Sequence, residues 1–433
     1  MIEEPEIEVG IVRSSKICFV LHTTYRNASG QRFMAGEHVA SGTTLGVCID
    51  GIRVSDCELC PQQPNSTFSV KDVEIGVGFH WDQKEDQSFA GKLRFVVDGD
   101  GIWAVNKIKV EDYLRSVIAS EMSATSDIEL LKAHAVASRS WLMAQVWNKG
   151  KFVGAGRRNL DGEKKYICWR DREDHKLFDV CADDHCQRYQ GVGRISQTAV
   201  DKAIAQTRGE ILTYEGNVCD ARFSKCCGGM TEVFSTCWTD DEVSYLRSFA
   251  DSTVWPSKYH DLQNEQEARE WIYDTPEAFC NTQDAKVIGQ ILNSYDQKTQ
   301  DFYRWRIEYG AEELGSIIKE KCGIDIGEVV DLVPLQRGPS GRIKLLRIVG
   351  SKDELTVGKE LEIRRLLSRT HLYSSAFSIS WKDKKTIVLS GAGWGHGVGM
   401  CQIGAAVMAN RGFNYRSILY HYFRRAMIEK KWV

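Results

Sequence analysis

The segment that runs from Val110 to Trp141, VEDYLRSVIASEMSATSDIELLKAHAVASRSW, holds the residue best placed for acid–base chemistry. Glu121 closes an expected amphipathic helix just before a loop of small residues. Partial burial at such a junction favours the protonated form of a carboxyl group, which suits it to general-acid work. Arg139 lies on the next expected helix, among Ala and Ser residues that let another surface approach closely. The alternative is an exposed helix-end charge with Arg139 as its solvated partner.

A second candidate is the glycine-rich segment SGAGWGHGVGMCQIG near the C-terminus. Alternating glycine in an extended segment leaves one face bare, so a ligand or another backbone can come very close. Trp394 and His396 would project from the opposite face, unless glycine torsions reorient the loop. The pattern does not match GxGxxG, so it gives no support for a dinucleotide site. The alternative is a close strand crossing with a buried, hydrogen-bonded histidine. The alternating glycines are Gly391, Gly393, Gly395, Gly397 and Gly399.

A third candidate is HKLFDVCADDHC, in which four potential ligands occur within a dozen residues: His175, Cys181, His185 and Cys186. Two imidazoles and two thiolates complete a closed tetrahedral zinc shell. The alternative is a Cys181–Cys186 disulfide with two surface histidines. The density of ligands favours one structural zinc ion, and no cofactor is expected for catalysis.

The fourth candidate is ARFSKCCGGMTEVF, with vicinal cysteines Cys226 and Cys227. One reading makes a cysteine, either Cys227 here or Cys401 in the glycine-rich segment, a nucleophile with His396 as its base. Another gives Gly228-Gly229 a tight turn and places Lys225 on a cleft wall. The vicinal cysteines are also plausible disulfide partners for Cys219 or Cys237. The residues alone leave these alternatives open.

The elements that must position these residues follow from hydrophobic periodicity. Residues 92–108 predict a hairpin that turns at Asp98-Gly99-Asp100-Gly101, and residues 110–122 predict a helix. Ser126 and Glu129 have the spacing of a capping box, which predicts a second helix from about Asp127 to Trp147. A helix over 196–207 and a strand over 210–214 are expected next.

The chain as a whole predicts an α+β fold with a mixed β-rich and helical core. Residues 1–90 read as an N-terminal β-rich region of short strands with turns. A catalytic core is expected over 91–247 and again over 375–433, where the glycine-rich loop lies. Residues 248–374 interrupt it and predict an inserted, polar α+β subdomain.

Composition narrows the class of protein. The 433 residues carry a formal net charge of −3, which gives no electrostatic argument for binding nucleic acid or an anionic membrane surface. No stretch has the apolar length that crosses a bilayer. The start, MIEEPEIEVG, has neither a basic nor an apolar signal region, so no signal peptide is visible in this sequence.

Taken together, these segments resemble the SpoIID/LytB family of bacterial cell-wall proteins. VEDYLRSVIASEM with LLKAHAVASRSW looks like its most recognisable block, and GAGWGHGVGMCQIGAAVMANRGFNYRSILYHYF closely matches its closing motif. TRGEILTY, FSKCCGGMTE, RGPSGRIKLLRIVG and LEIRRLL…YSSAFSI resemble the segments between them, in the same order. The resemblance runs from about Leu93 to Phe423. The Cys226-Cys227 pair and the ending RRAMIEKKWV depart from the family pattern.

The resemblance implies a peptidoglycan lytic transglycosylase that prefers glycan strands stripped of stem peptides. It places the family's catalytic glutamate on Glu121 and its important arginine on Arg139, and it supports zinc at the Cys/His cluster. It also implies a location in the cell envelope or periplasm and, as another role, enhancement of an N-acetylmuramoyl-L-alanine amidase by a wall-binding protein without catalysis. The residues expected to bind substrate are Ser224, Lys225, Gly228, Trp394 and His396.

Overall fold

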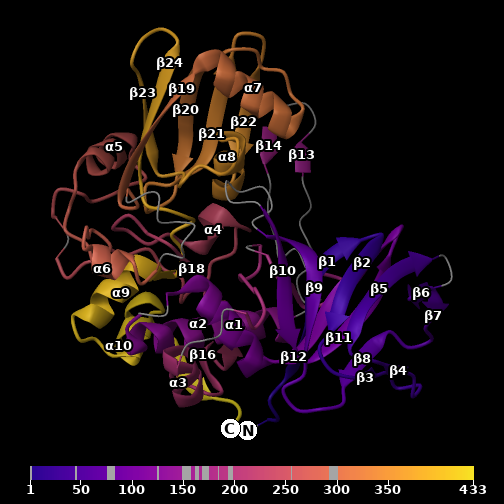
Figure 1. Ribbon diagram of the computed structural model, residues 1–433. Coiled ribbons are helices and arrows are strands. Elements are labelled where there is room, and N and C mark those ends of the chain that lie inside the picture. The colour runs from indigo at the N-terminus through magenta and orange to yellow at the C-terminus, as the bar shows by residue number, and fades with distance from the viewer. Residues whose placement is uncertain are drawn as a thin grey trace. The chain divides into compact units, whose positions relative to one another are not determined.

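The chain forms the predicted α+β fold, built from several sheets and short helices. The computed structural model describes residues 2–43, 46–75, 83–123, 126–148, 158–160, 165–167, 175–183, 185–193, 198–254, 256–291 and 301–433. The chain divides into two compact units (Figure 1). Unit 1 consists of Met1–Gly150, Asp174–Ile211 and Ile428–Val433, and unit 2 consists of Lys151–Glu173 and Leu212–Met427.

Two sheets make up the N-terminal part of unit 1, as the alternating sequence of residues 1–90 predicts. Their strand orders are β15-β1-β12-β11-β8-β3-β4 and β10-β9-β2-β5-β6-β7. In β2, Ile17, Phe19 and Leu21 are buried while the residues between them are more exposed. Period-two burial of this kind is what an antiparallel sheet with one covered face requires. The strands are β1 (Glu6–Ser14), β2 (Lys16–Leu21), β3 (Tyr25–Arg26), β4 (Arg32–Phe33), β5 (Gly36–Thr43), β6 (Gly46–Ile49), β7 (Ile52–Arg53), β8 (Glu58–Pro61), β9 (Thr67–Ile75), β10 (Gln83–Ala90), β11 (Lys92–Asp98), β12 (Gly101–Lys109) and β15 (Val180–Cys181).

The hairpin and helices that follow in unit 1 were well predicted. Strands β11 and β12 pair with Asp98 opposite Gly101, which confirms the turn. The helices α1 (Val110–Glu121), α2 (Ile128–Trp147) and α3 (Thr198–Gln206) contact one another. The predicted capping box is wrong: Asp127 is the N-cap of α2, and its carboxylate accepts a hydrogen bond of 2.8 Å from the amide of Glu129. The side chain of Asp127, one residue after Ser126, thus accepts from a free amide of the first helical turn.

Unit 2 contains sheets with orders β13-β14-β22-β21-β20, β19-β24-β23 and β18-β25. A fourth sheet, of order β17-β16-β26, includes the predicted strand β16 (Glu210–Tyr214), and β16 and β26 each contain a boundary between the units. The strands are β13 (Arg158–Leu160), β14 (Lys165–Ile167), β17 (Asn217–Val218), β18 (Phe223–Ser224), β19 (Arg304–Gly310), β20 (Val329–Arg337), β21 (Ile343–Gly350), β22 (Glu354–Gly358), β23 (Phe377–Trp381), β24 (Thr386–Ala392), β25 (Met400–Cys401) and β26 (Met427–Lys430). The helices are α4 (Phe234–Cys237), α5 (Glu265–Tyr273), α6 (Ala285–Ile288), α7 (Ala311–Cys322), α8 (Glu360–Leu366), α9 (Gln402–Asn410) and α10 (Tyr415–Tyr422).

One hydrophobic core of unit 2 joins parts of the chain that are far apart in sequence. It includes Tyr166, Trp305, Ile343 and Leu389, together with residues of α7 and α8, which lie against β20 to β22 (Figure 1). The two units and the four predicted segments therefore divide the chain differently. Residues 1–90 and the first helices share unit 1, and residues of 248–374 and 375–433 share this core.

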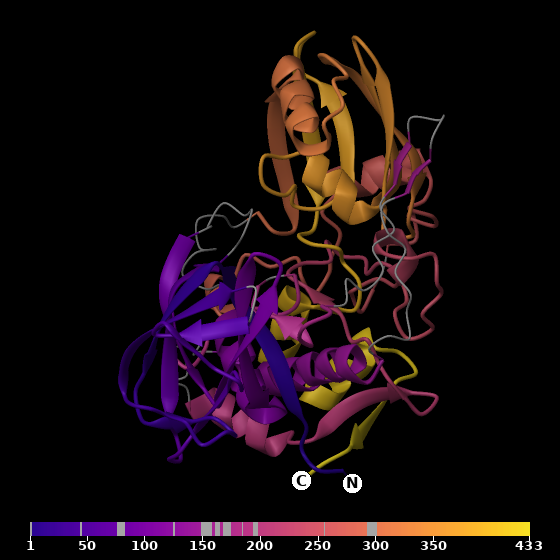
Figure 2. The same ribbon diagram turned by 90° about the vertical axis from the view of Figure 1, so that its right-hand side faces the viewer.

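The beginning and the end of the chain lie side by side in unit 1 in both views (Figure 1 and Figure 2). The amide of Ile2 donates a hydrogen bond of 2.8 Å to the carbonyl of Lys431. Among the described residues, no helix combines the length and the apolar character that a membrane span needs.

Candidate functional site

Glu121 occupies the last position of α1 and is half-buried. The backbone amide of Arg188 donates a long hydrogen bond of 3.4 Å to Glu121 Oε1. A carboxyl group with a backbone donor on one oxygen keeps its other oxygen available for a proton. The helix-end setting predicted for Glu121 is therefore present in the structure.

Arg139 lies within α2 and forms a buried ion pair with Glu111 of α1. Its Nη2 is 2.7 Å from Glu111 Oε2 and its Nε is 3.1 Å from Glu111 Oε1, while Nη1 donates to the carbonyl of Glu210 at 3.0 Å. The exposed fractions of the two side chains are 0% and 2%. The ion pair therefore holds α1 against α2. Glu111 was not predicted from the sequence as the partner of Arg139.

Glu111 also accepts hydrogen bonds from two other parts of unit 1. The indole Nε1 of Trp432 lies 2.8 Å from Glu111 Oε1, and the amide of Gly209 lies 3.0 Å from the same oxygen. A buried carboxylate with this many donors is well compensated for the loss of water. The sequence VEDYL does not predict the burial of the Glu111 carboxylate, because an acidic residue in a first helical turn normally faces solvent.

The structure brings together all four predicted zinc ligands, His175, Cys181, His185 and Cys186, whose ligand atoms lie within 4.8 Å of one another. Cys186 Sγ is 3.4 Å from His175 Nε2 and 3.5 Å from His185 Nδ1, and Cys181 Sγ is 3.9 Å from His185 Nδ1. Zinc bonds of about 2.3 Å to sulfur and about 2.0–2.1 Å to nitrogen, at tetrahedral angles, place such atoms about 3.6 Å apart. The donor set and spacing thus fit one zinc ion.

The segment that carries these ligands also packs against both helices of the Glu121 region. Gln187 accepts a hydrogen bond from the hydroxyl of Tyr113 and donates one to the carbonyl of Ser138. Tyr189 stacks on Tyr113, with ring centroids 4.9 Å apart. Arg188, which contacts Glu121, lies between Gln187 and Tyr189 in sequence. The segment that carries the predicted zinc ligands therefore contacts the Glu121 carboxylate and both neighbouring helices.

The glycine-rich loop of unit 2 is not an extended strand beyond Gly391, which closes β24. The next alternating glycines, Gly393 to Gly399, all have positive φ angles between 74° and 94°. A side chain at Gly399 would place Cβ 2.1 Å from the carbonyl oxygen of Arg222, and one at Gly397 would place it 2.4 Å from the Arg342 guanidinium. The expectation of a bare extended face is wrong, because the glycine torsions fold the loop onto its own unit. The close approach to another backbone, which the sequence also predicted, is present at Arg222.

The residues predicted to bind substrate meet around this loop within unit 2. The hydroxyl of Ser224 accepts a hydrogen bond of 3.2 Å from the amide of Gly397, and a Cβ at Gly228 would lie 2.8 Å from the amide nitrogen of Gly393. Trp394 stacks on Tyr373 with centroids 4.1 Å apart. Lys225 donates through Nζ to the carbonyl of Ile291 at 2.9 Å.

His396 is half-buried and neutral in this environment. Burial, and then the positive charge of Arg222, hold the pKa of His396 well below its usual range. Its Nδ1 accepts a hydrogen bond of 3.0 Å from the amide of Val398, and its ring packs edge-on against Trp238. Glu121 belongs to unit 1 and His396 to unit 2, so the prediction that both line one cleft stays a prediction.

The vicinal cysteines have other neighbours than predicted. Cys227 Sγ lies 3.5 Å from Cys280 Sγ, and its backbone amide lies 3.2 Å from Cys401 Sγ. No disulfide occurs among the described cysteines, so pairing with Cys219 or Cys237 is not observed. The thiols of Cys227 and Cys401 lie with Cys280, whereas the imidazole of His396 packs on Trp238. These contacts give no support to a cysteine–histidine catalytic pair.

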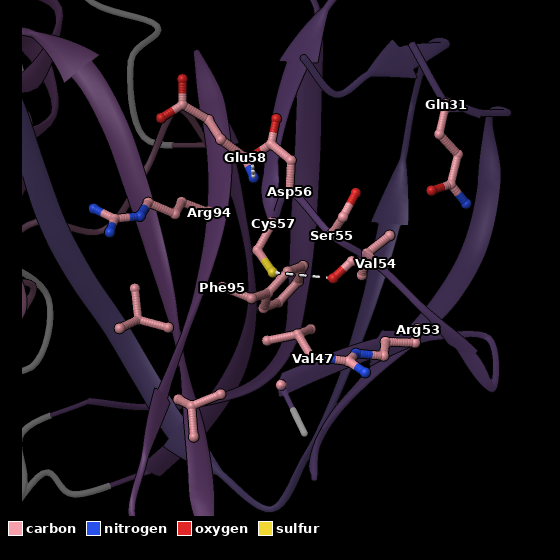
Figure 3. Close-up of a pocket in the computed structure, with 13 residues that line it drawn as sticks. Gln31, Val47, Arg53, Val54, Ser55, Asp56, Cys57, Glu58, Arg94 and Phe95 are labelled. Carbon is pink, nitrogen blue, oxygen red and sulfur yellow. Dashed lines mark hydrogen bonds between the residues drawn. The ribbon is translucent and has the colours of Figure 1, made fainter. Parts of the chain in front are cut away.

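A pocket of about 800 Å³ lies in the N-terminal sheets of unit 1 (Figure 3). Asp56 from the turn before β8, Glu58 from β8 and Arg94 from β11 are among the residues that line it, and Cys57 Sγ approaches the carbonyl of Val54 at 4.0 Å. Cys60 Sγ instead contacts Glu58, so the CxxC pair does not converge on one point. None of the predicted site residues lines this pocket.

Two family models match parts of this chain. Residues 98–214 match the Stage II sporulation protein model, SpoIID, and this range holds Glu121, Arg139 and the four predicted zinc ligands. The chain is related to the SpoIID/LytB family. The resemblance predicted from the motifs is thus confirmed. Residues 232–399 match a domain of unknown function, DUF8618, which includes Trp394 and His396.

Curated relatives extend the SpoIID likeness over most of the chain. Stage II sporulation protein D of Bacillus subtilis is 24% identical over 76% of this chain and 76% of its own length. An uncharacterized protein of Brachyspira hyodysenteriae is 27% identical over 77% of this chain and 70% of its own. The amidase enhancer of Bacillus subtilis is 25% identical over 72% of this chain, but the match spans only 39% of that protein.

Proposed function

We propose that this protein acts on the bacterial cell wall, outside the cytoplasm, as a lytic transglycosylase of peptidoglycan glycan strands. The observation that carries the proposal is Glu121, a half-buried carboxyl group at the end of α1 within the SpoIID-matched residues. The amide of Arg188 holds one of its oxygens. A single carboxyl group in such a position suffices when the nucleophile belongs to the substrate.

In this reaction, protonated Glu121 donates its proton to the oxygen of the MurNAc–GlcNAc bond while that bond breaks. The Glu121 carboxylate then takes the proton of the MurNAc C6 hydroxyl as this oxygen bonds to C1, and the product is 1,6-anhydro-MurNAc. Hydrolytic glycosidases need a second carboxylate for water or for a covalent intermediate. An internal hydroxyl removes that need, because it is already held near C1. The proton lost in the first step is regained in the second, so Glu121 is regenerated.

His175, Cys181, His185 and Cys186 would hold a structural zinc ion in this scheme. A closed shell of four protein ligands leaves no position for substrate, so the ion supplies order and not chemistry. The segment around it has little apolar surface, and the free energy of metal binding would stabilise its fold. Through Arg188, this order extends to Glu121.

Removing the thiols of this cluster tests its role. The double variant Cys181→Ser/Cys186→Ser should lose about one zinc ion per chain, measured by elemental analysis after purification without chelator. Activity should fall as well, because the Arg188 amide is no longer held. Cys57→Ser/Cys60→Ser, at the separate CxxC pair, is the matched control and should keep both zinc and activity. A metal-free protein with a Cys181–Cys186 disulfide would contradict the assignment.

The activity itself is tested on purified glycan strands without stem peptides. Mass spectrometry of the products should show 1,6-anhydro-MurNAc ends, and alkylation of the thiols outside the zinc site of Cys181 and Cys186 should leave this product unchanged. Strands with reducing MurNAc ends would indicate a hydrolase. The absence of any cleavage by folded protein would contradict the proposal.

A second candidate is a wall-binding protein that activates an N-acetylmuramoyl-L-alanine amidase. It is favoured by the likeness to a relative named amidase enhancer. Such a protein would bind glycan strands without shortening them and would raise the rate of an added amidase. The product analysis separates the two functions, because only the transglycosylase makes anhydro ends by itself.

A further inference from the structure

Unit 2 contains a second group of potential metal ligands, distant in sequence from the cluster in unit 1. The thiols of Cys227, Cys280 and Cys401 and a carboxylate oxygen of Asp251 lie within 4.8 Å of one another, and all four residues are buried. They come from four separate segments: the turn after β18, the loop before α5, the loop between α5 and α6, and the start of α9. Three thiols and a carboxylate gathered from such distant segments require a physical reason.

The spacing of these atoms suits a single tetrahedral ion. Cys227 Sγ lies 3.5 Å from Cys280 Sγ and 3.3 Å from Asp251 Oδ2. Around a zinc ion, ligand bond lengths of about 2.3 Å to sulfur and about 2.0–2.2 Å to oxygen give separations of about 3.8 Å between two sulfurs and about 3.6 Å between sulfur and oxygen. The group is thus close to the size that one ion imposes.

Cys401 is placed to be a thiolate. It is the N-cap of α9, and its sulfur accepts hydrogen bonds from the amide of Gly404 at 3.4 Å and from the amide of Cys227 at 3.2 Å. Two amide donors and the positive end of a helix stabilise negative charge on sulfur. Donors of this kind commonly surround the thiolate ligands of a metal and fix their orientation.

Asp251 is held from behind, which leaves its other oxygen toward the thiols. The hydroxyl of Tyr422 and Nε2 of His421 lie 2.9 Å and 3.0 Å from Asp251 Oδ1. Oδ2 faces Cys227. A Cβ at Gly404 would lie 2.5 Å from this Oδ2 and 2.2 Å from the Tyr422 hydroxyl. The absence of a side chain at Gly404 therefore lets the carboxylate and its tyrosine partner reach this place.

We propose that Cys227, Cys280, Cys401 and Asp251 bind one structural zinc ion that joins the four segments of unit 2. Three thiolates select a soft, tetrahedral ion, and a closed shell of protein ligands is typical of structural zinc. The buried negative charges then have a cation at their centre in place of water. The site lies outside the SpoIID-matched residues and does not depend on the proposed glycan chemistry.

Two other occupants fit less well. A disulfide joins only two of the three thiols and leaves the carboxylate facing the remaining one without a cation. A multi-iron cluster distributes its thiolates over two or more irons, which spreads the sulfurs farther apart than a single ion does. The thiol of Cys226 also interacts with Cys280 and Cys401. Because Cys226 and Cys227 are adjacent, a substitution at one of them disturbs the other. Substitution of Cys280 is therefore the cleaner test of the site.

Metal content of the full chain tests the proposal. In the Cys181→Ser/Cys186→Ser background, which lacks both thiolates of the His175/Cys181/His185/Cys186 cluster, about one zinc ion per chain should remain. X-ray absorption of that protein should show about three sulfur ligands, one oxygen and no imidazole. Adding Cys280→Ser should remove the remaining zinc, and Cys219→Ser, a buried cysteine outside the group, should leave it in place.

The absorption measurement needs no substitution in the second cluster, so it holds even if the Cys280 variant fails to fold. Zinc-free protein in the first-cluster background, with all other residues native, would overturn the proposal. So would an intact mass two hydrogens lower, with the lost hydrogens mapped to a Cys227–Cys280 disulfide. Imidazole ligands in the absorption spectrum of that protein would also overturn it.

Discussion

Replacing Glu121 with glutamine should reduce the formation of 1,6-anhydro ends by at least ~10²-fold, which is the scale of general acid–base effects. Glutamine keeps the shape of the side chain and an oxygen that accepts from the Arg188 amide, but it can neither give nor take the proton. Since Glu121 is half-buried at a helix end, the thermal midpoint of the variant should stay close to that of the native chain. Quantitative mass spectrometry of digested glycan strands gives the rates.

Glu129→Gln is the matched control. Glu129 lies in the first turn of α2, where it forms an ion pair with Lys132. The substitution removes the same charge from the neighbouring helix, so a general electrostatic effect would appear in both variants. Near-native production of anhydro ends by Glu121→Gln would remove Glu121 from the mechanism.

The largest effect on stability is expected from Arg139→Met. The substitution leaves the carboxylate of Glu111 buried with two neutral donors, Gly209 and Trp432, and no cation. Removing one partner of a buried ion pair destabilises a protein by about 3–5 kcal/mol. Urea denaturation followed by tryptophan fluorescence should show the loss, and activity per folded molecule should change much less than in Glu121→Gln.

A second substitution distinguishes the ion pair from simple packing. In Glu111→Gln/Arg139→Met, the neutral amide keeps an oxygen for Gly209 and Trp432, so about half of the lost stability should return. Lys71→Met, which breaks the surface pair with Asp86, should have little effect. A double variant no more stable than Arg139→Met would show that the charge on Glu111 is not the cause.

Periodicity predicted those elements whose pattern depends on local sequence. The β11–β12 hairpin, α1, α2 and β16 follow from apolar spacing and turn residues, and α2 begins within one residue of its predicted start. The convergence of His175, Cys181, His185 and Cys186 could also be predicted, because these four residues are close in sequence. Local spacing cannot reveal a partner that the fold brings from elsewhere.

The contacts that were not predicted join residues from different segments of the chain. Arg139 lies 28 residues from its partner Glu111, on the next helix, and Cys227 lies 174 residues from Cys401, so the spacing within a single helix or strand reveals neither pair. Asp251 carries no motif of its own, and Cys280 stands alone in its segment. The backbone torsions of Gly393 to Gly399 could not be predicted from the sequence for a different reason. Glycine adopts extended and left-handed backbone conformations with similar ease.

The contact between Trp432 and Glu111 joins residues 321 positions apart, across the whole of unit 2 in sequence. During translation, α1 and α2 are made early, but the indole that helps to satisfy the Glu111 carboxylate is made only after residues 212–427. Until then, the Arg139–Glu111 pair lacks one of its buried donors, and unit 1 remains incompletely stabilised while unit 2 is synthesised. Unit 1 can therefore complete its native contacts only at the end of translation, although most of its residues are translated first.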